Sequence, residues 1–297
     1  MAATDLKRYE SLSVEAADIR PHESTWQRVR RSGSVRLGGA VIAVLVLIAI
    51  AAPWLGTVDP TMFDAGSRDL VKHTFWFGSD SLGRDIYSRV IYGTRVSLFV
   101  GLVTALVALG AGILFGLFAG YIRWLDGVLM RLMDGIMAIP AILIAIALVA
   151  MWRASLTTVI IAIAIPEIPR VTRLVRSLVL TIREEPYVEA AISLGSSTPK
   201  IMFSHILPNT IAPLVVQGTF ICASAILIES ILSFLGVGLP PEIPTWGNIM
   251  AEGRIAFVQY PHNIFIPGIF LTVTVLAVNI LGDGLRDTLD PKMAKRI

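Results

Sequence analysis

The sequence predicts an all-α integral membrane protein with six transmembrane helices. Hydrophobic residues make up 55% of its 297 residues and charged residues only 16%, whereas a soluble domain carries about 25% charged residues. Mean hydropathy is +0.72, and several apolar runs reach the ~20 residues that a helix needs to cross a bilayer. The net charge of +3 is a small basic excess. In a membrane protein such an excess reflects lysines and arginines kept on one face of the membrane, so it gives no reason to expect nucleic-acid binding.

The chain is expected to begin with a polar tail and one span. Residues 1–35 are polar and end in a basic cluster, which is typical of a cytosolic tail and not of a cleaved signal peptide. Residues 36–56 hold a continuous apolar run and are expected to form the first transmembrane helix. Residues 57–95 are mostly polar and are expected to lie on the other, periplasmic side.

A helix lying in the membrane interface is expected near the end of that periplasmic segment. Ile86 and Val90 recur at helical spacing, as do Tyr87 and Ile91, with charged residues between them. This pattern suits a helix that lies flat at the membrane surface. Trp76 and Tyr87 are the residue types that gather in the aromatic belt at this depth.

Five further spans are expected between residues 96 and 285. Their apolar runs cover residues 96–121, 128–152, 156–180, 206–235 and 264–281. Glycines four residues apart, at Gly112, Gly116 and Gly120, predict that the first of these spans approaches a neighbouring helix closely.

Prolines mark two of these spans. Pro140 lies at the middle of the run 128–152, and the sequence Pro166-Glu167-Ile168-Pro169 is expected to interrupt the run 156–180. Residues 236–263, rich in proline, are expected to be a second outer loop, and residues 286–297 a cytosolic C-terminal tail.

The distribution of basic residues predicts which loops face the cytosol. With six spans the two termini share a side, and 18 of the 25 lysines and arginines fall on it. The positive-inside rule therefore places both termini in the cytosol, together with the loop at residues 184–209.

This loop contains a polar-to-amphipathic stretch, residues 187–209, between two strongly apolar regions. Residues 187–194 hold good helix formers, and Val188, Ala191 and Leu194 are expected on roughly one face of a short helix that Gly195 ends. Pro199 suits the first turn of a second short helix. The spacing alone leaves two alternatives: a docking surface for a partner, or a structured loop without one.

The motif in this loop resembles that of a known family. Glu189-Ala190-Ala191, followed by Gly195 and then by Ile206-Leu207-Pro208, is similar to the EAA loop of bacterial ABC importer permeases. The resemblance implies a MetI-like, type I importer permease fold, and a coupling helix that fits a groove on the ATP-hydrolysing subunit. The residues that would form this interface are Tyr187, Val188, Glu189, Ala190, Ala191, Leu194 and Gly195.

Three other stretches resemble one subgroup, the second permease subunit of dipeptide, oligopeptide and nickel importers. They are the block at residues 75–98, the sequence P-T-W-G-N-I-M at residues 244–250, and the C-terminal stretch at residues 279–292. The resemblance implies a bacterial inner-membrane protein that forms half of a transport pathway. It also implies three kinds of partner: a second permease chain, two ATP-binding subunits and a periplasmic or lipid-anchored substrate-binding protein.

The sequence contains no signature of catalysis. It has no G-x-x-x-x-G-K-[ST] loop for nucleotide phosphates and no G-x-S-x-G or H-E-x-x-H motif. Cys222 lies alone in an apolar run and the four histidines are scattered, so neither a disulfide nor a metal site is expected. ATP and Mg²⁺ are expected on the partner ATPases, and this chain is not expected to be an enzyme.

Ionisable residues within the spans are candidates for function. Glu229 lies late in the run 206–235, where it either lines or gates the pathway or makes a packing hydrogen bond. Asp134 is expected to pair with a nearby arginine, and Pro140 follows it as a second candidate for the pathway or its gate. For Glu167 the flanking prolines favour a structural role, because they leave backbone groups that need polar partners.

Two other classes of transport protein are alternatives to the importer. A secondary transporter would carry protons through the intramembrane carboxylates, but it has no need of a docking loop. A channel would need a filter motif, which is absent from the sequence. Within the importer class, nickel, glutathione or another small solute is the alternative cargo to dipeptides and oligopeptides.

Overall fold

The structure, a computed structural model, describes residues 25–62, 76–80 and 82–289, and these are almost entirely helical. The helices in chain order are α2 (Thr25–Arg31), α3 (Gly33–Ala51), η1 (Ala52–Trp54), α4 (Ile86–Tyr121), α5 (Arg123–Met137), α6 (Ala141–Met151), α7 (Leu156–Arg183), α8 (Pro186–Ser193), α9 (Thr198–Lys200), the π-helix η2 (Ile201–Ile206), α10 (Leu207–Phe234), α11 (Trp246–Gly253), η3 (Arg254–Ala256) and α12 (His262–Leu289). Within the described residues there is no β-strand, only an isolated bridge between Ser79 and Asp85.

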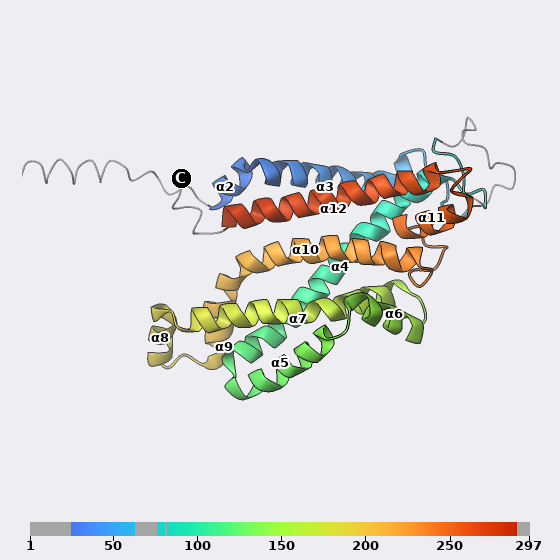
Figure 1. Cartoon of the computed structure of the whole chain (residues 1–297). Helices are drawn as coiled ribbons and strands as arrows, with labels where there is room; N and C mark the ends of the chain where they lie inside the picture. Colours follow the sequence, from blue (N-terminus) through green and yellow to red (C-terminus); the bar gives the residue numbers. More distant parts are fainter. Residues whose placement is uncertain (1–24, 63–75, 81, 290–297) are drawn as a thin grey trace, which may run out of the picture.

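The long helices form a bundle in which each packs on the next. α3 lies against α12, α12 against α10, α10 on α4 and α4 on α7, with α5 and α6 on the far side of α7 (Figure 1). α8 and α9 project from one end of the bundle, and α11 covers the other end. The chain therefore presents two distinct ends, and each carries one of its irregular segments.

Four stretches are long and apolar enough to cross a membrane, or five if the bent pair α5–α6 counts as one span. The four are Gly33–Trp54, Ile86–Tyr121, Thr198–Phe234 and His262–Leu289. The first agrees with the expected span 36–56. α7 is not among them, because Glu167 and three arginines interrupt its apolar sequence. The six-span count and the cytosolic termini therefore stay predictions.

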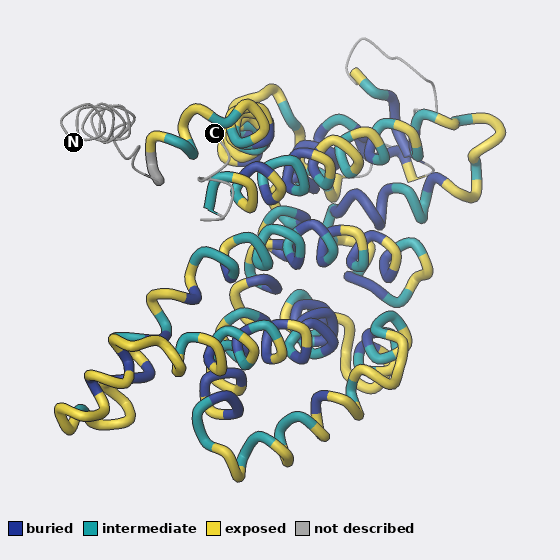
Figure 2. The backbone as a smooth tube through the Cα atoms, turned by 60° about the vertical axis from the view of Figure 1, so that its left-hand side comes forward, coloured by how far each residue is buried: buried dark blue, intermediate teal, exposed yellow. Residues whose placement is uncertain are grey.

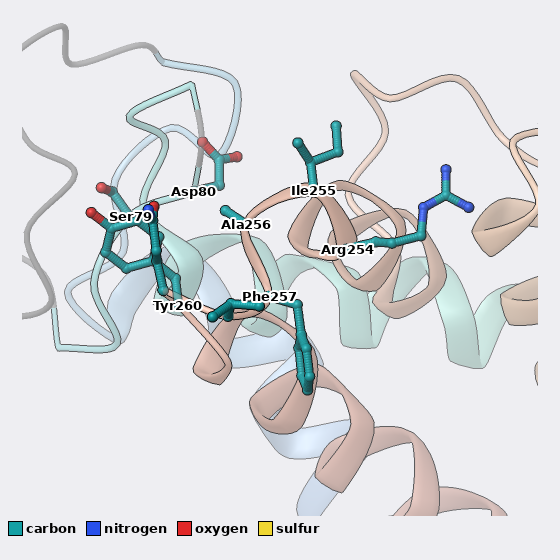
Figure 3. A pocket seen from close by; sticks show the side chains of 9 residues that line it. Ser79, Asp80, Arg254, Ile255, Ala256, Phe257 and Tyr260 are labelled. Atoms are coloured by element: carbon teal, nitrogen blue, oxygen red, sulfur yellow. The ribbon is translucent and has the colours of Figure 1, made fainter.

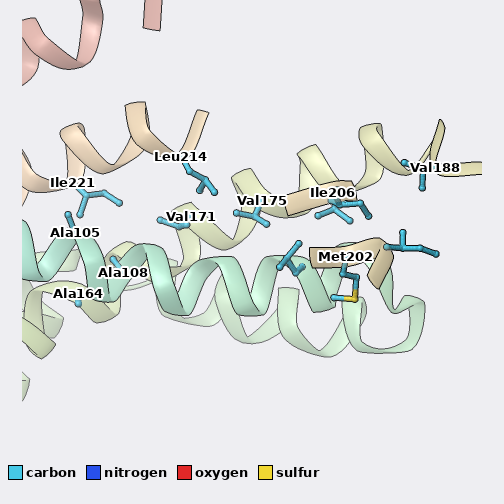
Figure 4. Packing of buried hydrophobic residues seen from close by; sticks show 13 residues of the cluster. Ala105, Ala108, Ala164, Val171, Val175, Val188, Met202, Ile206, Leu214 and Ile221 are labelled. Carbon is cyan, nitrogen blue, oxygen red and sulfur yellow. The ribbon is translucent and has the colours of Figure 1, made fainter. Parts of the chain in front are cut away.

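The glycines of α4 bring it into close contact with α7, as their spacing predicts. A Cβ atom at Gly112 would lie 2.4 Å from the Val171 Cβ, and one at Gly116 would lie 2.5 Å from that of Val175. Gly120 repeats the contact with Val179. The three valines are fully buried, and Val171 and Val175 lie within the same apolar cluster (Figure 4).

This contact predicts opposite effects for two alanine substitutions on one helix. Gly116→Ala is expected to destabilise the protein by about 1–3 kcal/mol, because its Cβ would overlap Val175 and the Thr172 carbonyl oxygen. Gly110→Ala is the matched control: nothing lies within 4 Å of its Cβ position, and alanine favours a helix over glycine by about 1 kcal/mol. The thermal midpoints in detergent, at one scan rate, test this. A midpoint for Gly116→Ala at or above that of the parent would contradict the contact.

The expected interfacial helix is the first part of α4, and the described residues just before it, 76–80 and 82–85, contain no separate helix. α4 begins at Ile86, with Asp85 as its N-cap accepting a hydrogen bond from the Ser88 backbone N–H at 2.8 Å, and it continues without a break to Tyr121. Ile86 and Val90 are buried against Trp246 of α11. Burial against another element, rather than against the membrane surface, explains the helical spacing of apolar residues here.

The expected interruption at Pro166 and Pro169 is wrong. Both residues are buried within α7, which runs unbroken from Leu156 to Arg183. A proline removes one hydrogen bond from a helix and tends to kink it. Here Val159 and Ile163, before the prolines, and Val171, after them, are buried in the packed bundle. This packing outweighs the local preference.

The expected single span at residues 128–152 is two helices. α5 and α6 meet at an angle of 86°, and Pro140 is the first residue beyond the turn, with φ −53° and ψ 130°. Proline favours an extended conformation in the residue before it and cannot continue the hydrogen bonding of a helix. Pro140 thus marks the bend.

The expected terminal tails fall partly outside the described residues. Residues 1–24 and 290–297 are not described, while part of the tail assigned to residues 1–35 forms α2 and the start of α3. α12 extends to Leu289, beyond the boundary expected at residue 286.

Candidate functional site

α8 forms where the sequence predicts a short helix. Pro186 occupies its first turn, a position that needs no N–H donor. Gly195 has φ +76°, a conformation that glycine adopts without cost. The Ser196 N–H donates to the Ala191 carbonyl oxygen at 3.1 Å and the Gly195 N–H to that of Ile192 at 2.9 Å. These two bonds are those of a Schellman motif, so the prediction that Gly195 ends the helix is confirmed.

The inner face of α8 packs on the body of the protein. Val188 is fully buried and Ala191 is 8% exposed. Val188 belongs to the apolar cluster that also contains Met202 and Ile206 of η2 (Figure 4). The buried pair fixes which side of α8 faces its own chain.

Leu194 does not lie on that inner face, contrary to expectation. Its side chain is 86% exposed, the largest exposure of any apolar residue in this segment. Six residues at about 100° each rotate it about 120° away from Val188, and Leu194 already occupies the C-cap position. The spacing i, i+3, i+6 keeps the first two residues on one face but not the third.

The outer face of α8 combines three apolar residues with an acidic one. Ile192 is 46% exposed, and Glu189 and Ala190 are also exposed. With Leu194 they form what we call the outer face of α8: Glu189, Ala190, Ile192 and Leu194. Figure 2 shows that this end of the bundle is largely exposed.

A hydrogen bond of Tyr187 links the start of α8 to α10. The Asn209 Nδ2 donates to the Tyr187 hydroxyl oxygen at 3.1 Å and to the His205 carbonyl oxygen at 2.7 Å. Burial, and secondarily the charge of Glu185, raise the pKa of the Tyr187 hydroxyl. The hydroxyl therefore stays protonated at neutral pH, and Tyr187 acts here as a neutral hydrogen-bonding tether.

Glu229 lies at the opposite end of the bundle, where α10 meets α11. It is fully buried, and its Oε1 accepts a hydrogen bond from the Ser233 hydroxyl at 2.8 Å. The other carboxylate oxygen, Oε2, and the hydroxyl of the neighbouring Ser230 are buried and have no hydrogen-bond partner among the described residues. α11 packs tightly here, since a Cβ atom at Gly247 would lie 2.7 Å from the Ser230 Cα. These contacts match the packing alternative, while a role of Glu229 in gating stays a prediction.

Asp134 and Pro140 lie elsewhere, on the far side of α7. Asp134 forms an ion pair with Arg173 at 2.5 Å, which confirms the expected arginine partner. Pro140 lies at the bend between α5 and α6. Glu167 pairs with Arg170 at 2.9 Å, although its role was expected to be the satisfaction of backbone groups. Glu229 therefore lies apart from Asp134 and Glu167, which both pair with arginines of α7.

A buried cluster of charges at the α11 end was not predicted from the sequence. Asp80 and Glu252 accept hydrogen bonds from both Arg84 and Arg89, including one from the Arg84 Nε to the Asp80 Oδ2 at 2.7 Å. Arg84, Arg89 and Asp80 are 4%, 1% and 3% exposed, and Glu252 is 19% exposed. In these four described residues two cations thus balance two anions. The signal was present in the spacing of Asp80 and Arg84, but the partner Glu252 is 168 residues from Arg84.

A cavity of about 410 Å³ opens beside this cluster (Figure 3). It is lined by Ser79, Asp80 and residues 254–260. Ile255 is 84% and Val258 95% exposed next to it. The expected outer loop is therefore a folded cap: α11 is buried along much of its length, and the segment that follows it is exposed.

Comparisons with known proteins agree on one family. Residues 112–295 match the family described as "Binding-protein-dependent transport system inner membrane component". Residues 21–72 match the "N-terminal TM domain of oligopeptide transport permease C".

Curated relatives match over nearly the whole chain. A probable peptide ABC transporter permease, y4tQ of Sinorhizobium fredii, is 49% identical over 96% of this chain and 99% of its own. The dipeptide transport system permease DppC of Alkalihalophilus pseudofirmus is 40% identical over 93% and 91%. The glutathione transport system permease GsiD of Salmonella typhimurium is 42% identical over 92% and 91%.

A solved structure shows the same fold. The inward-facing MetNI methionine ABC transporter includes a chain that matches 68% of this one, and 97% of its own length, with a TM-score of 0.56 and 17% identity. This likeness covers the helical arrangement alone.

Proposed function

This chain belongs to the family of binding-protein-dependent transport system inner membrane components and is a permease subunit of an ABC importer, and we propose that its cargo is short peptides. The observation that carries the proposal is the match at 49% identity to a peptide permease over 96% of the chain. Relatives named for dipeptides and for glutathione, itself a tripeptide, support the same class of cargo. Nickel or another small solute is the alternative.

A chain with six spans, the number that the sequence predicts, would supply half of a pathway. We therefore propose that the chain pairs with a second permease subunit in a bacterial inner membrane, with a substrate-binding protein outside. Two ATPase subunits on the cytosolic side would bind ATP and Mg²⁺. Closure of the ATPase dimer would draw the permease helices from an inward-open to an outward-open arrangement.

The outer face of α8 is proposed as the contact with one ATPase subunit. The buried Val188 and Ala191 hold α8 against its own chain, so force applied to the outer face passes directly to the body of the protein. Exposed apolar residues beside an acidic one suit a helix that docks in a groove. After α8 the chain continues into one helical segment, Thr198–Phe234, which includes η2 and α10. This segment would carry the movement into the membrane.

ATP-driven uptake tests the proposal against the secondary-transporter alternative. The complete importer in proteoliposomes, with its binding protein, is expected to accumulate a labelled dipeptide in a vanadate-sensitive and protonophore-resistant manner. Uptake that a protonophore abolishes and vanadate leaves unchanged would overturn the importer mechanism.

The cargo is tested separately. The binding protein is purified and its bound ligand identified by mass spectrometry. A short peptide is the expected result, and a bound nickel ion in its place would assign a different cargo to the same machine.

A further inference from the structure

The C-terminal half of α7 exposes a charged face at the depth of the membrane. Val171 contacts α4 at Gly112, nine residues before α4 ends at Tyr121. At 1.5 Å per residue this is about 13 Å from the end of that helix. α4 is apolar enough to cross the membrane, so Arg170 and Arg173, on either side of Val171, lie within the bilayer thickness.

α7 cannot turn this charged face inward. Its opposite face carries Val171, Val175 and Val179, which fill the spaces at the α4 glycines. The exposed positions are Arg170, just before the first of these valines, and Arg173 and Ser177, which lie between them. The packing of α7 on α4 therefore fixes the direction in which the arginines project.

Two ion pairs hold the charged groups on this face. Arg170 is 53% exposed, and its Nη1 donates to both carboxylate oxygens of the buried Glu167, at 2.9 and 3.1 Å. Arg173 is 46% exposed and holds Asp134 of α5, which is 60% exposed. Half-exposed charges at membrane depth face a water-filled cavity or a partner, because exposure to lipid is unfavourable for them.

We propose that the α5–α7 seam, defined as Asp134, Glu167, Arg170 and Arg173, lines the water-filled part of the pathway and binds the two charged ends of a zwitterionic peptide. The inference rests on the proposed function and deepens it. Arg170 would face the peptide carboxylate and Asp134 the peptide ammonium group.

The dimensions and charge of the seam fit such a cargo. Arg170 precedes Arg173, the partner of Asp134, by three residues, which is a rise of about 4.5 Å along the helix. The ends of an extended dipeptide are about 7 Å apart, a separation that these long side chains span. Two carboxylates and two guanidinium groups carry no net charge, and neither does a zwitterion.

Thiol labelling tests whether the seam faces water. In the assembled importer, with Cys222→Ala as background, Arg170→Cys is expected to react with a membrane-impermeant charged thiol reagent in inverted vesicles. Val171→Cys is the matched control, because it is the next residue at the same depth but faces α4, and it is expected to stay unlabelled. Equal reactivity at the two positions, whether high or low, would overturn the assignment.

Uptake measurements test the role of the charge. Arg170→Gln is expected to lower ATP-driven dipeptide uptake about tenfold, and Arg170→Lys to remain within about threefold of the parent. A purely structural ion pair is distinguished by the double variant Glu167→Gln/Arg170→Gln, which removes both charges together. Uptake that stays low in the double variant supports contact with the cargo, whereas restored uptake would mean that Arg170 only neutralises Glu167.

The two tests separate this inference from the proposed function. Labelling needs no cargo, so it reports on the seam even if peptides are not the substrate. Failure of the parent importer to take up any dipeptide would refute the proposed cargo, and with it the assignment of the peptide ends. The thiol labelling would still decide, independently of the cargo, whether the seam is accessible to water.

Discussion

The substitution Leu194→Asp is expected to lower ATP-driven uptake at least tenfold while the permease still inserts and folds. Leu194 is 86% exposed and packs against little of its own chain, so the substitution costs little in stability. In a docked complex the same side chain would be buried in the groove of the ATPase, where an unpaired carboxylate is strongly unfavourable. A tenfold loss corresponds to about 1.4 kcal/mol, the lower end of the range for a residue that dominates an interface.

The matched control for this variant is Ile255→Asp. Ile255 is 84% exposed, but it lies beside α11 at the opposite end of the bundle. Ile255→Asp should leave the co-purification of the ATPase unchanged, whereas Leu194→Asp should reduce this co-purification. Glu189→Lys tests the acidic part of the same outer face by reversing its charge.

The measurement is the ratio of peptide transported to ATP hydrolysed. A lower ratio in Leu194→Asp and Glu189→Lys, at normal abundance in the membrane, is the expected result. Normal transport together with normal co-purification of the ATPase in both variants would remove α8 as the coupling contact.

Local chemistry made α8 predictable, and also the close contact of α4 with another helix, although not that the partner is α7. Pro186 and Gly195 set the ends of α8 through backbone requirements that only neighbouring residues can meet. Gly112, Gly116 and Gly120 predict a close helix contact, because glycines at this spacing in an apolar helix commonly allow a neighbouring helix to approach. In each case the cause lies within a few residues, so the sequence displays it.

Features that depend on distant partners could not be predicted in this way. Local rules predict that the prolines of α7 interrupt a helix, yet α7 is continuous through both of them, with its valines packed on α4. Leu194 illustrates a limit of periodicity, because over two turns a small angular error becomes a change of face. From the sequence alone Arg89 would be taken for a surface residue, because its partner Glu252 is distant along the chain and comes beside it only in the fold.

The substitution Arg89→Met is expected to be among the most destabilising single changes in the protein, by about 3–5 kcal/mol. Arg89 donates to both Asp80 and Glu252, and a further bond runs from its Nη2 to the Pro241 carbonyl oxygen at 3.4 Å. Without it, the buried Asp80 and the partly buried Glu252 would have Arg84 as their one remaining arginine partner among the described residues. One negative charge would remain uncompensated in a site where Asp80 is 3% exposed.

The control is Arg95→Met on the same helix. Arg95 is exposed and stacks over Tyr92, with its guanidinium carbon 5.8 Å from the ring centre. Loss of such a contact costs about 0.5–1 kcal/mol. In detergent at one temperature the half-life of Arg89→Met should therefore be much shorter than that of Arg95→Met. The half-life of the parent protein should be close to that of Arg95→Met.

A double variant separates the charge imbalance from the loss of packing. Arg89→Met/Glu252→Leu removes one charge of each sign and leaves Asp80 paired with Arg84 at 2.7 Å. Because the uncompensated charge is gone, the double variant should be more stable than the sum of the two single losses by at least about 1.5 kcal/mol. Strict additivity would mean that the arginine acts by its bulk. A positive coupling would establish that the segment around residues 80–89 is held to α11 by balanced buried charge, across 163 residues of sequence.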